Sequence, residues 1–84
     1  MYVEFLGIPR ERAGVAEAEV EAGTLGQLLG TLATKFPGFG DLISADGLHP
    51  SLAVNLNGDE FVSSLDTALD ADDHVLILSA DVGG

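Results

Sequence analysis

The sequence predicts an α+β fold in which a mixed sheet of about four to five strands is covered by one main helix. Two segments, 15–22 and 51–57, alternate apolar and polar residues, as strands with one buried face do. The segment 24–36 instead spaces its apolar residues as a helix does. Residues 74–80 (HVLILSA) form an apolar run of strand length, typical of a central strand. Since the chain has 84 residues, we expect one domain that spans 1–84.

The first two strands are expected to form a hairpin. Residues 1–8 (MYVEFLGI) are rich in β-branched and aromatic side chains, and Pro9 ends the segment. Residues 15–22 (VAEAEVEA) place Glu17, Glu19 and Glu21 on one side and small or apolar residues on the other. With residues 9–14 as the connection, the two segments make a hairpin whose second strand has a solvated, acidic face.

The helix is predicted to begin at Thr24. Thr24 and Gln27 have the spacing of a capping box, in which side chains satisfy backbone N–H groups at the helix start. The dipeptide Pro37-Gly38 ends the helix. An irregular connection over 39–49 follows, in which we expect a short helical turn at 41–44. The buried stripe of the helix consists of Leu25, Leu28, Leu29, Leu32 and Phe36.

The second half of the chain predicts further strands. Residues 51–57 (SLAVNLN) alternate, and Asn57-Gly58 is a strong hairpin signal because both central residues of a type I′ turn have positive φ. Residues 59–62 would return alongside, and 74–80 would lie beside the first strand at the centre of the sheet. A sheet of this order with one covering helix is the β-grasp, or ubiquitin-like, fold. The predicted core includes Leu52, Val54, Leu56, Leu65 and Leu69.

The composition restricts the partners. With 14 acidic and 3 basic residues the formal net charge is -11, which argues against nucleic acid and anionic membranes. This charge fits either solubility or electrostatic steering toward a basic cleft on a partner protein. The absence of cysteine excludes a disulfide scaffold and a thiol nucleophile. The chain has no basic leader with an apolar core and no apolar run of the roughly 20 residues of a membrane span, so we expect a cytoplasmic protein.

The side chains predict neither a catalytic nor a metal site. His49 and His74 stand apart, and the aspartates of 70–73 crowd a turn in which such side chains usually bond their own backbone. The glutamates of 15–22 lie on a solvated face, where a carboxylate rarely acts as acid or base. No Ser-His-Asp spacing or glycine-rich phosphate loop is recognisable. We therefore expect no catalytic residue, no metal, no bound cofactor, and a protein that is not itself an enzyme.

The chain ends in Gly83 and Gly84, and this terminus is the strongest chemical motif. We expect 80–84 to be a flexible tail. Because glycine has no Cβ, Gly83 and Gly84 can enter a channel too narrow for other residues, with Asp81 and Val82 behind them. A terminal carboxylate that is activated as an acyl-adenylate has a good leaving group, which sulfide or an amine can displace. An unstructured tail without a function is the alternative.

Three groups of residues, taken together in their order and spacing, form a pattern specific enough to indicate a family. They are Phe5-Leu6-Gly7 with Arg10-Glu11 and Gly14; Ala53-Val54-Asn55 with Asn57-Gly58; and Leu65, Leu69, Asp73, Val75, Ile77 and Leu78 before Gly83-Gly84. In these features the whole chain resembles the MoaD/ThiS family of ubiquitin-like sulfur carriers, and MoaD more than ThiS. The tail departs from the MoaD pattern, because Ser79-Ala80-Asp81-Val82 stands where Pro-Pro-Val commonly precedes the last three residues.

The resemblance implies that Gly84 is adenylated by an E1-like enzyme of the MoeB/ThiF kind, which uses ATP, and becomes a thiocarboxylate that donates sulfur. It implies a sulfur-accepting enzyme as the second partner: a molybdopterin synthase large subunit, or the acceptor of a related pathway. It also implies an apolar docking patch formed here by Leu6, Phe61 and Leu78, although core packing explains Leu78 equally well. The alternatives are a ubiquitin-like modifier that forms isopeptide bonds through Gly84, and an interaction module with an inert tail.

Overall fold

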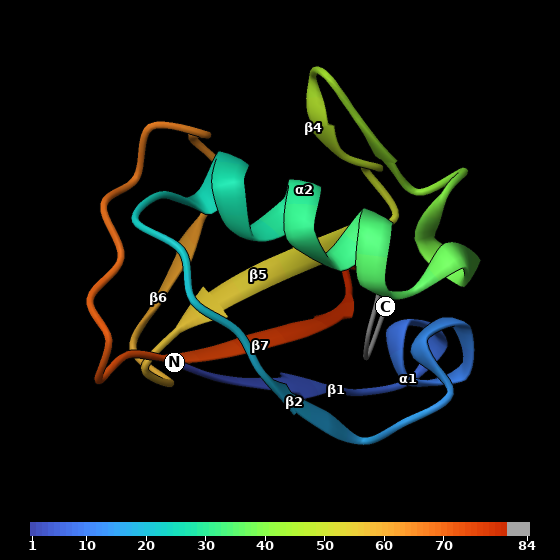
Figure 1. Ribbon diagram of the computed structural model, residues 1–84, viewed down its shortest axis with the longest axis horizontal. Helices are drawn as coiled ribbons and strands as arrows, with labels where there is room; N and C mark the ends of the chain where they lie inside the picture. Colours follow the sequence, from blue (N-terminus) through green and yellow to red (C-terminus); the bar gives the residue numbers. More distant parts are fainter. Residues whose placement is uncertain (81–84) are drawn as a thin grey trace.

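The computed structural model of the protein describes residues 1–80, and the predicted tail residues Asp81, Val82, Gly83 and Gly84 lie outside the described residues. The elements are β1 (Tyr2–Phe5), α1 (Ile8–Ala13), β2 (Glu17–Glu19), α2 (Leu25–Lys35), the 3₁₀ helix η1 (Pro37–Phe39), β3 (Ile43–Ser44), β4 (Gly47–Leu48), β5 (Leu52–Leu56), β6 (Glu60–Val62) and β7 (His74–Ser79). Figure 1 shows α2 lying across one face of the larger sheet. None of the helices within 1–80 is both long enough and apolar enough to cross a membrane.

The larger sheet has five strands in the order β2-β1-β7-β5-β6. Strand β1 runs parallel to β7, and the β1–β2, β5–β7 and β5–β6 pairs are antiparallel. The first and last strands therefore lie side by side at the centre, and the predicted β-grasp fold is confirmed (Figure 1). Strands β3 and β4 form a separate small hairpin.

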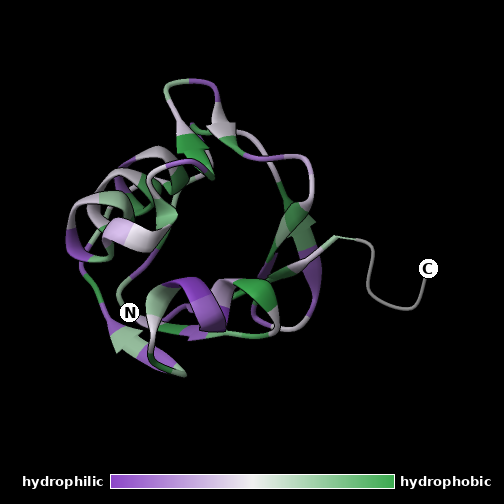
Figure 2. Ribbon diagram, turned by 90° about the vertical axis from the view of Figure 1, so that its right-hand side faces the viewer, coloured by the Kyte–Doolittle hydropathy of each residue, from purple (hydrophilic) through white to green (hydrophobic). Residues whose placement is uncertain are grey.

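A hydrophobic core fills the space between α2 and the sheet. The helix contributes its predicted leucines, and the sheet contributes alternate residues of its central strands, because successive side chains of a strand point to opposite faces. Figure 2 shows the corresponding pattern, with green hydrophobic and purple hydrophilic segments interleaved along the ribbon. The most completely buried core side chains are those of Val3, Phe5, Leu25, Leu28, Leu32, Phe39, Val75 and Ile77.

The predicted capping of α2 is present in a slightly shifted form. The Thr24 side chain accepts a hydrogen bond from the Gln27 N–H at 3.2 Å, as predicted. The Gln27 side-chain oxygen accepts from the N–H of Gly23 at 2.8 Å, one residue before the N-cap. Both bonds satisfy backbone donors at the start of the helix, so the shift preserves the role of the motif.

The prediction of a plain connection over 9–14 is wrong, because a short helix, α1, covers Ile8–Ala13. Proline is favoured in the first turn of a helix, where its missing N–H leaves no intrahelical bond unmade, so Pro9 lies inside this helix rather than in a loop. Gly14 ends the helix by donating its N–H to the Arg10 carbonyl oxygen at 3.0 Å. The first strand accordingly stops at Phe5, earlier than predicted.

The predicted helical turn at 41–44 is also wrong. The turn lies earlier, in η1, and Ile43–Ser44 belongs instead to the β3–β4 hairpin. Phe39 accounts for this difference, because its fully buried ring packs against Phe5, with ring centroids 5.7 Å apart. That packing holds the residues directly after α2 against the core.

The turn between β5 and β6 has the predicted conformation, with Asn57 at φ 60° and Gly58 at φ 71°. Asn57 also joins this turn to the start of β7. Its Oδ1 accepts from the His74 N–H at 2.9 Å, and its Nδ2 donates to Asp73 Oδ1 at 3.0 Å. One residue therefore positions both the hairpin and the first residue of the central strand.

Candidate functional site

Strand β7 leads from the centre of the sheet to the base of the tail, Ser79 and Ala80. Ser79 is paired with Leu52 of β5, and the Ala80 N–H donates to the Ser51 carbonyl oxygen at 2.8 Å. On its other side β7 is paired with β1. The pairing with β1 ends at Ile77, so the backbone of Leu52 and Ser51 fixes the base of the tail from the β5 side. Beyond it, outside the described residues, lie the predicted reactive residue Gly84 and the predicted threading residues Asp81, Val82 and Gly83.

The outer face is the side of the sheet turned away from α2. Residues that are paired across strands share a face, so the register identifies its members. Strands β1 and β2, with the first residue of β7, supply an acidic half, and the rest of β7 with β5 and β6 supplies most of an apolar half. The acidic half contains Tyr2, Glu4, Glu17, Glu19 and His74, and the apolar half contains Leu6, Ala53, Asn55, Phe61, Leu76 and Leu78.

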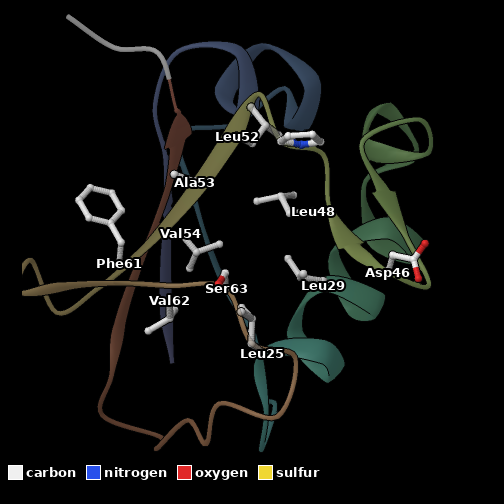
Figure 3. A pocket seen from close by; sticks show the side chains of 11 residues that line it. Leu25, Leu29, Asp46, Leu48, Leu52, Ala53, Val54, Phe61, Val62 and Ser63 are labelled. Atoms are coloured by element: carbon white, nitrogen blue, oxygen red, sulfur yellow. The ribbon is translucent and has the colours of Figure 1, made fainter. Parts of the chain in front are cut away.

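The predicted docking residues all lie on the outer face. Leu6 is 39% exposed and Phe61 is 67% exposed, whereas Leu78 is half-buried. The structure brings Leu6 and Leu78 together, because the parallel register of β1 and β7 continues to this pair. Phe61 lies two strands away, and Figure 3 shows it on the opposite side of β5 from Leu29 and Leu48. Their role in docking stays a prediction.

Leu76, which was not among the predicted docking residues, connects those that the fold separates. Leu76 is paired with Asn55, and Asn55 is paired with Phe61, so a continuous row crosses β7, β5 and β6. The signal was available, because Leu76 precedes Leu78 by two positions and alternate residues of a strand share a face. We call Leu6, Phe61, Leu76 and Leu78 the apolar patch.

The acidic half of the outer face contains a hydrogen-bonded cluster. The Tyr2 hydroxyl donates to Glu17, and His74 Nε2 lies 3.1 Å from Glu4 Oε1. The rings of Tyr2 and His74 meet edge to face with centroids 4.6 Å apart. The hydrogen bond to Glu17, together with desolvation and the charge of that carboxylate, raises the pKa of Tyr2 to about 12. The cluster keeps this half polar and negative beside the apolar patch.

The aspartates of 70–73 lie in a turn, and Asp73 stabilises that turn through hydrogen bonds. Asp73 Oδ2 accepts from the Asp70 N–H at 2.7 Å, and Asp73 Oδ1 accepts from the Asn57 amide at 3.0 Å. These two bonds favour the carboxylate and lower the pKa of Asp73. Across residues 1–80, no group of three or more His, Cys, Asp or Glu side chains is placed to hold a metal ion.

His49 and Ser51 hydrogen-bond to each other beside the base of the tail. Ser51 Oγ lies 2.8 Å from His49 Nδ1, and the Ser51 N–H donates to the same nitrogen at 3.0 Å. Both side chains are exposed, and in the described part of the chain no carboxylate is hydrogen-bonded to the other ring nitrogen. The pair therefore lacks the orienting third group that nucleophilic catalysis uses.

A groove of about 360 Å³ opens at the edge of the core between α2, β5 and the β3–β4 hairpin (Figure 3). Asp46 and Ser63 are its polar side chains, and they come from separate segments of the chain. An active site gathers several polar groups around one point, which this groove does not do. Its apolar lining comes mainly from Leu25, Leu29, Leu48, Leu52, Val54 and Val62, and Ala53 and Phe61 of the outer face also contribute to it.

These features define a small ubiquitin-like β-grasp protein whose central strand leads to a Gly-Gly terminus. The chain belongs to the ThiS family, since the sequence model of that family matches residues 3–84. It is a ubiquitin-like sulfur carrier, and both the predicted family and the predicted class of function are confirmed.

Solved structures share this fold over nearly the whole chain. SAMP1 from Haloferax volcanii is 25% identical, with a TM-score of 0.80 over 99% of this chain and 97% of that one. CysO from Mycobacterium tuberculosis is 28% identical, with a TM-score of 0.79 over 94% and 97% of the two chains. A chain of the Amycolatopsis orientalis BexX/CysO complex is 25% identical, with a TM-score of 0.80 over 99% and 98%. No curated protein matches the chain.

Proposed function

We propose that the sulfur is carried on Gly84. The terminal carboxylate attacks the α-phosphorus of ATP in the active site of an E1-like enzyme, which forms the acyl-adenylate and releases pyrophosphate. Hydrosulfide delivered to that enzyme then attacks the acyl carbon, AMP leaves, and loss of the S–H proton gives a thiocarboxylate on Gly84. The observation that supports this proposal is the Gly83-Gly84 terminus, which follows the central strand β7 in a member of the ThiS family.

The chain acts in this cycle as a protein substrate and sulfur donor. Members of its family are small sulfur carriers rather than catalysts. ATP is bound and consumed by the activating enzyme, which is of the MoeB/ThiF kind, so the chain itself holds no cofactor. The cytoplasm, where ATP is available, is the proposed compartment.

Docking through the apolar patch would deliver the tail to a partner's active site. Leu76 and Leu78 of the patch belong to β7, the same strand that ends at the base of the tail. Gly84 lies four positions beyond Ala80, and four fully extended residues span about 14 Å. A partner that covers the apolar patch therefore needs its reacting group within about 14 Å of Ala80.

The second partner is a sulfur-accepting enzyme. CysO of Amycolatopsis orientalis forms a complex with BexX, which gives a precedent for a carrier of this fold seated on a partner. A molybdopterin synthase large subunit is one candidate acceptor. The tail of this chain has no proline after β7 and carries a charge at Asp81, and both features favour an acceptor dedicated to this carrier.

ATP–pyrophosphate exchange with the purified E1-like enzyme of the host tests the proposal. We expect the wild-type chain to support exchange and a chain lacking Gly84 to support none. A Glu21→Gln variant, altered at an exposed position, is the matched control and should keep the wild-type rate. Exchange that continues without Gly84 would contradict the proposal.

The same deletion separates the carrier from the ubiquitin-like modifier. A blot for covalent conjugates in the host would show a ladder that disappears with Gly84 if the chain also forms isopeptide bonds. A blot without a ladder leaves the sulfur carrier as the function of Gly84.

A further inference from the structure

Asn55 lies between Leu76 and Phe61 in the apolar half of the outer face and is the one buried polar residue among those the structure describes, with 8% exposure. Its side-chain Oδ1 is shielded from solvent and has no hydrogen-bond partner within 1–80. Burying an amide oxygen without a partner is unfavourable, and native proteins contain few such groups. The folded chain therefore keeps an unused acceptor on this face.

The neighbours of Asn55 show where this acceptor is directed. Alternate residues of β5, Val54 and Leu56, face the core, so Asn55 faces the other way. Across the strands it is paired with Leu76 on β7 and with Phe61 on β6, both in the apolar patch. Oδ1 is shielded in the free chain, so a protein that covers this row reaches it through a change of rotamer, and Phe61, whose ring is 67% exposed, is the neighbour free to make that change.

The acidic half of the outer face determines the charge that a protein docked on this face must carry. Glu4, Glu17 and Glu19 lie on β1 and β2, and none of the five strands contains Lys or Arg. The Met1 ammonium, 3.6 Å from Glu19, offsets only part of this charge. A partner seated on the whole face therefore meets an apolar area with one acceptor and, beside it, a negative area.

We propose that Asn55 is the polar specificity residue of carrier docking, and that its Oδ1 accepts a hydrogen bond from an N–H group of the activating enzyme. The enzyme surface is apolar around that donor and basic where it covers Glu4, Glu17 and Glu19. This inference rests on the proposed function and extends it by stating what the activating enzyme must offer. A wrong partner without the donor leaves the acceptor buried and unpaired, which makes the contact selective.

Replacing Asn55 by leucine separates docking from folding. Since Oδ1 has no partner within 1–80, Asn55→Leu should leave the melting temperature within about 4 °C of wild type or raise it. In pyrophosphate exchange it should raise the KM for the chain about 10-fold or more, with kcat unchanged, because the enzyme's donor loses its acceptor. Asn55→Asp, which keeps an oxygen acceptor there, should give a lower KM than Asn55→Leu.

Thr31→Leu, the same kind of change on the exposed side of α2, is the control and should leave KM unchanged. An Asn55→Leu variant with the wild-type KM would overturn the inference. A melting temperature lowered by more than about 4 °C would also overturn it, since Asn55 would then have a structural role. A KM for wild type that does not rise with added salt would refute the basic surface. If the wild-type chain itself supports no exchange, the proposed function is wrong. If the wild-type chain and Asn55→Leu support exchange with the same KM, the proposed function stands and only the inference about Asn55 is wrong.

Discussion

The turn η1 packs directly on the backbone of α1, and replacing Gly38 by alanine tests that contact. A Cβ at Gly38 would lie 2.1 Å from the Arg12 carbonyl oxygen and 2.9 Å from its carbonyl carbon. Real Cβ atoms essentially never approach a heavy atom of a residue that is distant in the chain closer than 3.0 Å, so η1 or α1 must move by about 1 Å. Both obstructing atoms are backbone, so no side chain can rotate away to make room.

Replacing Gly38 by alanine would disturb more than the contact with the Arg12 backbone. Arg12 Nη1 donates to the Gly38 carbonyl oxygen at 3.1 Å and pairs with Asp41 Oδ1 at 2.6 Å, and both distances depend on the present position of η1. Phe39, the next residue, is fully buried and must move with it. Overpacking typically costs about 1–3 kcal/mol, and we expect Gly38→Ala at the upper end because backbone and core shift together. In a domain of this size a loss of about 3 kcal/mol lowers the melting temperature by about 12–24 °C.

Gly30→Ala is the matched control, because the same substitution there has the opposite effect. Gly30 lies in α2, and a Cβ built on it meets nothing within 4 Å. Alanine in a helix interior is favoured over glycine by about 0.5–1 kcal/mol, so this variant should melt a few degrees higher than wild type. Thermal unfolding followed by far-ultraviolet circular dichroism measures both. A Gly38→Ala variant as stable as wild type would refute the close packing of η1 on α1.

One residue appended after Gly84 should block adenylation, because the reacting carboxylate then overshoots the enzyme's site; exchange at the wild-type rate by a mass-verified, untrimmed chain would contradict this. Tyr2 is the single tyrosine of a chain without tryptophan, so its ionisation is visible by absorbance. We expect the ionisation of Tyr2 to have its midpoint at about pH 12 in wild type and closer to the ordinary value of 10.0 in Glu17→Ala. A midpoint near 10.0 in folded wild type would show that the hydrogen bond between Tyr2 and Glu17 is absent. Phe61→Ser should leave the melting temperature within about 4 °C, since the ring is 67% exposed, and should raise the KM for the chain in exchange; an unchanged KM would remove Phe61 from the docking surface.

The sequence predicts best those features that depend on near neighbours. Asn57-Gly58 has the expected positive φ values because turn conformation depends on the two residues themselves. The stripe of leucines from Leu25 to Leu32 predicts which side of α2 is buried, because helical spacing places them on one face. The central position of β7 follows from its apolar run, since a strand with neighbours on both sides is the most buried.

Features that depend on residues far away in the sequence could not be predicted in the same way. Alternation over 15–22 predicts a longer strand than β2, which ends where its pairing with Tyr2 and Glu4 of β1 ends. Pro9 is compatible with both a strand end and a first helical turn, and the sequence does not decide between them. The buried acceptor of Asn55 depends on Phe61 and Leu76 from two other strands.

The intact mass of the chain after incubation with its activating enzyme, ATP and a sulfur donor tests the central claim most directly. We predict the exchange of one terminal oxygen for sulfur, assigned to Gly84 by fragmentation and absent from a chain that lacks Gly84. A chain that is adenylated under these conditions, with pyrophosphate released, and yet retains an ordinary carboxylate would contradict the account.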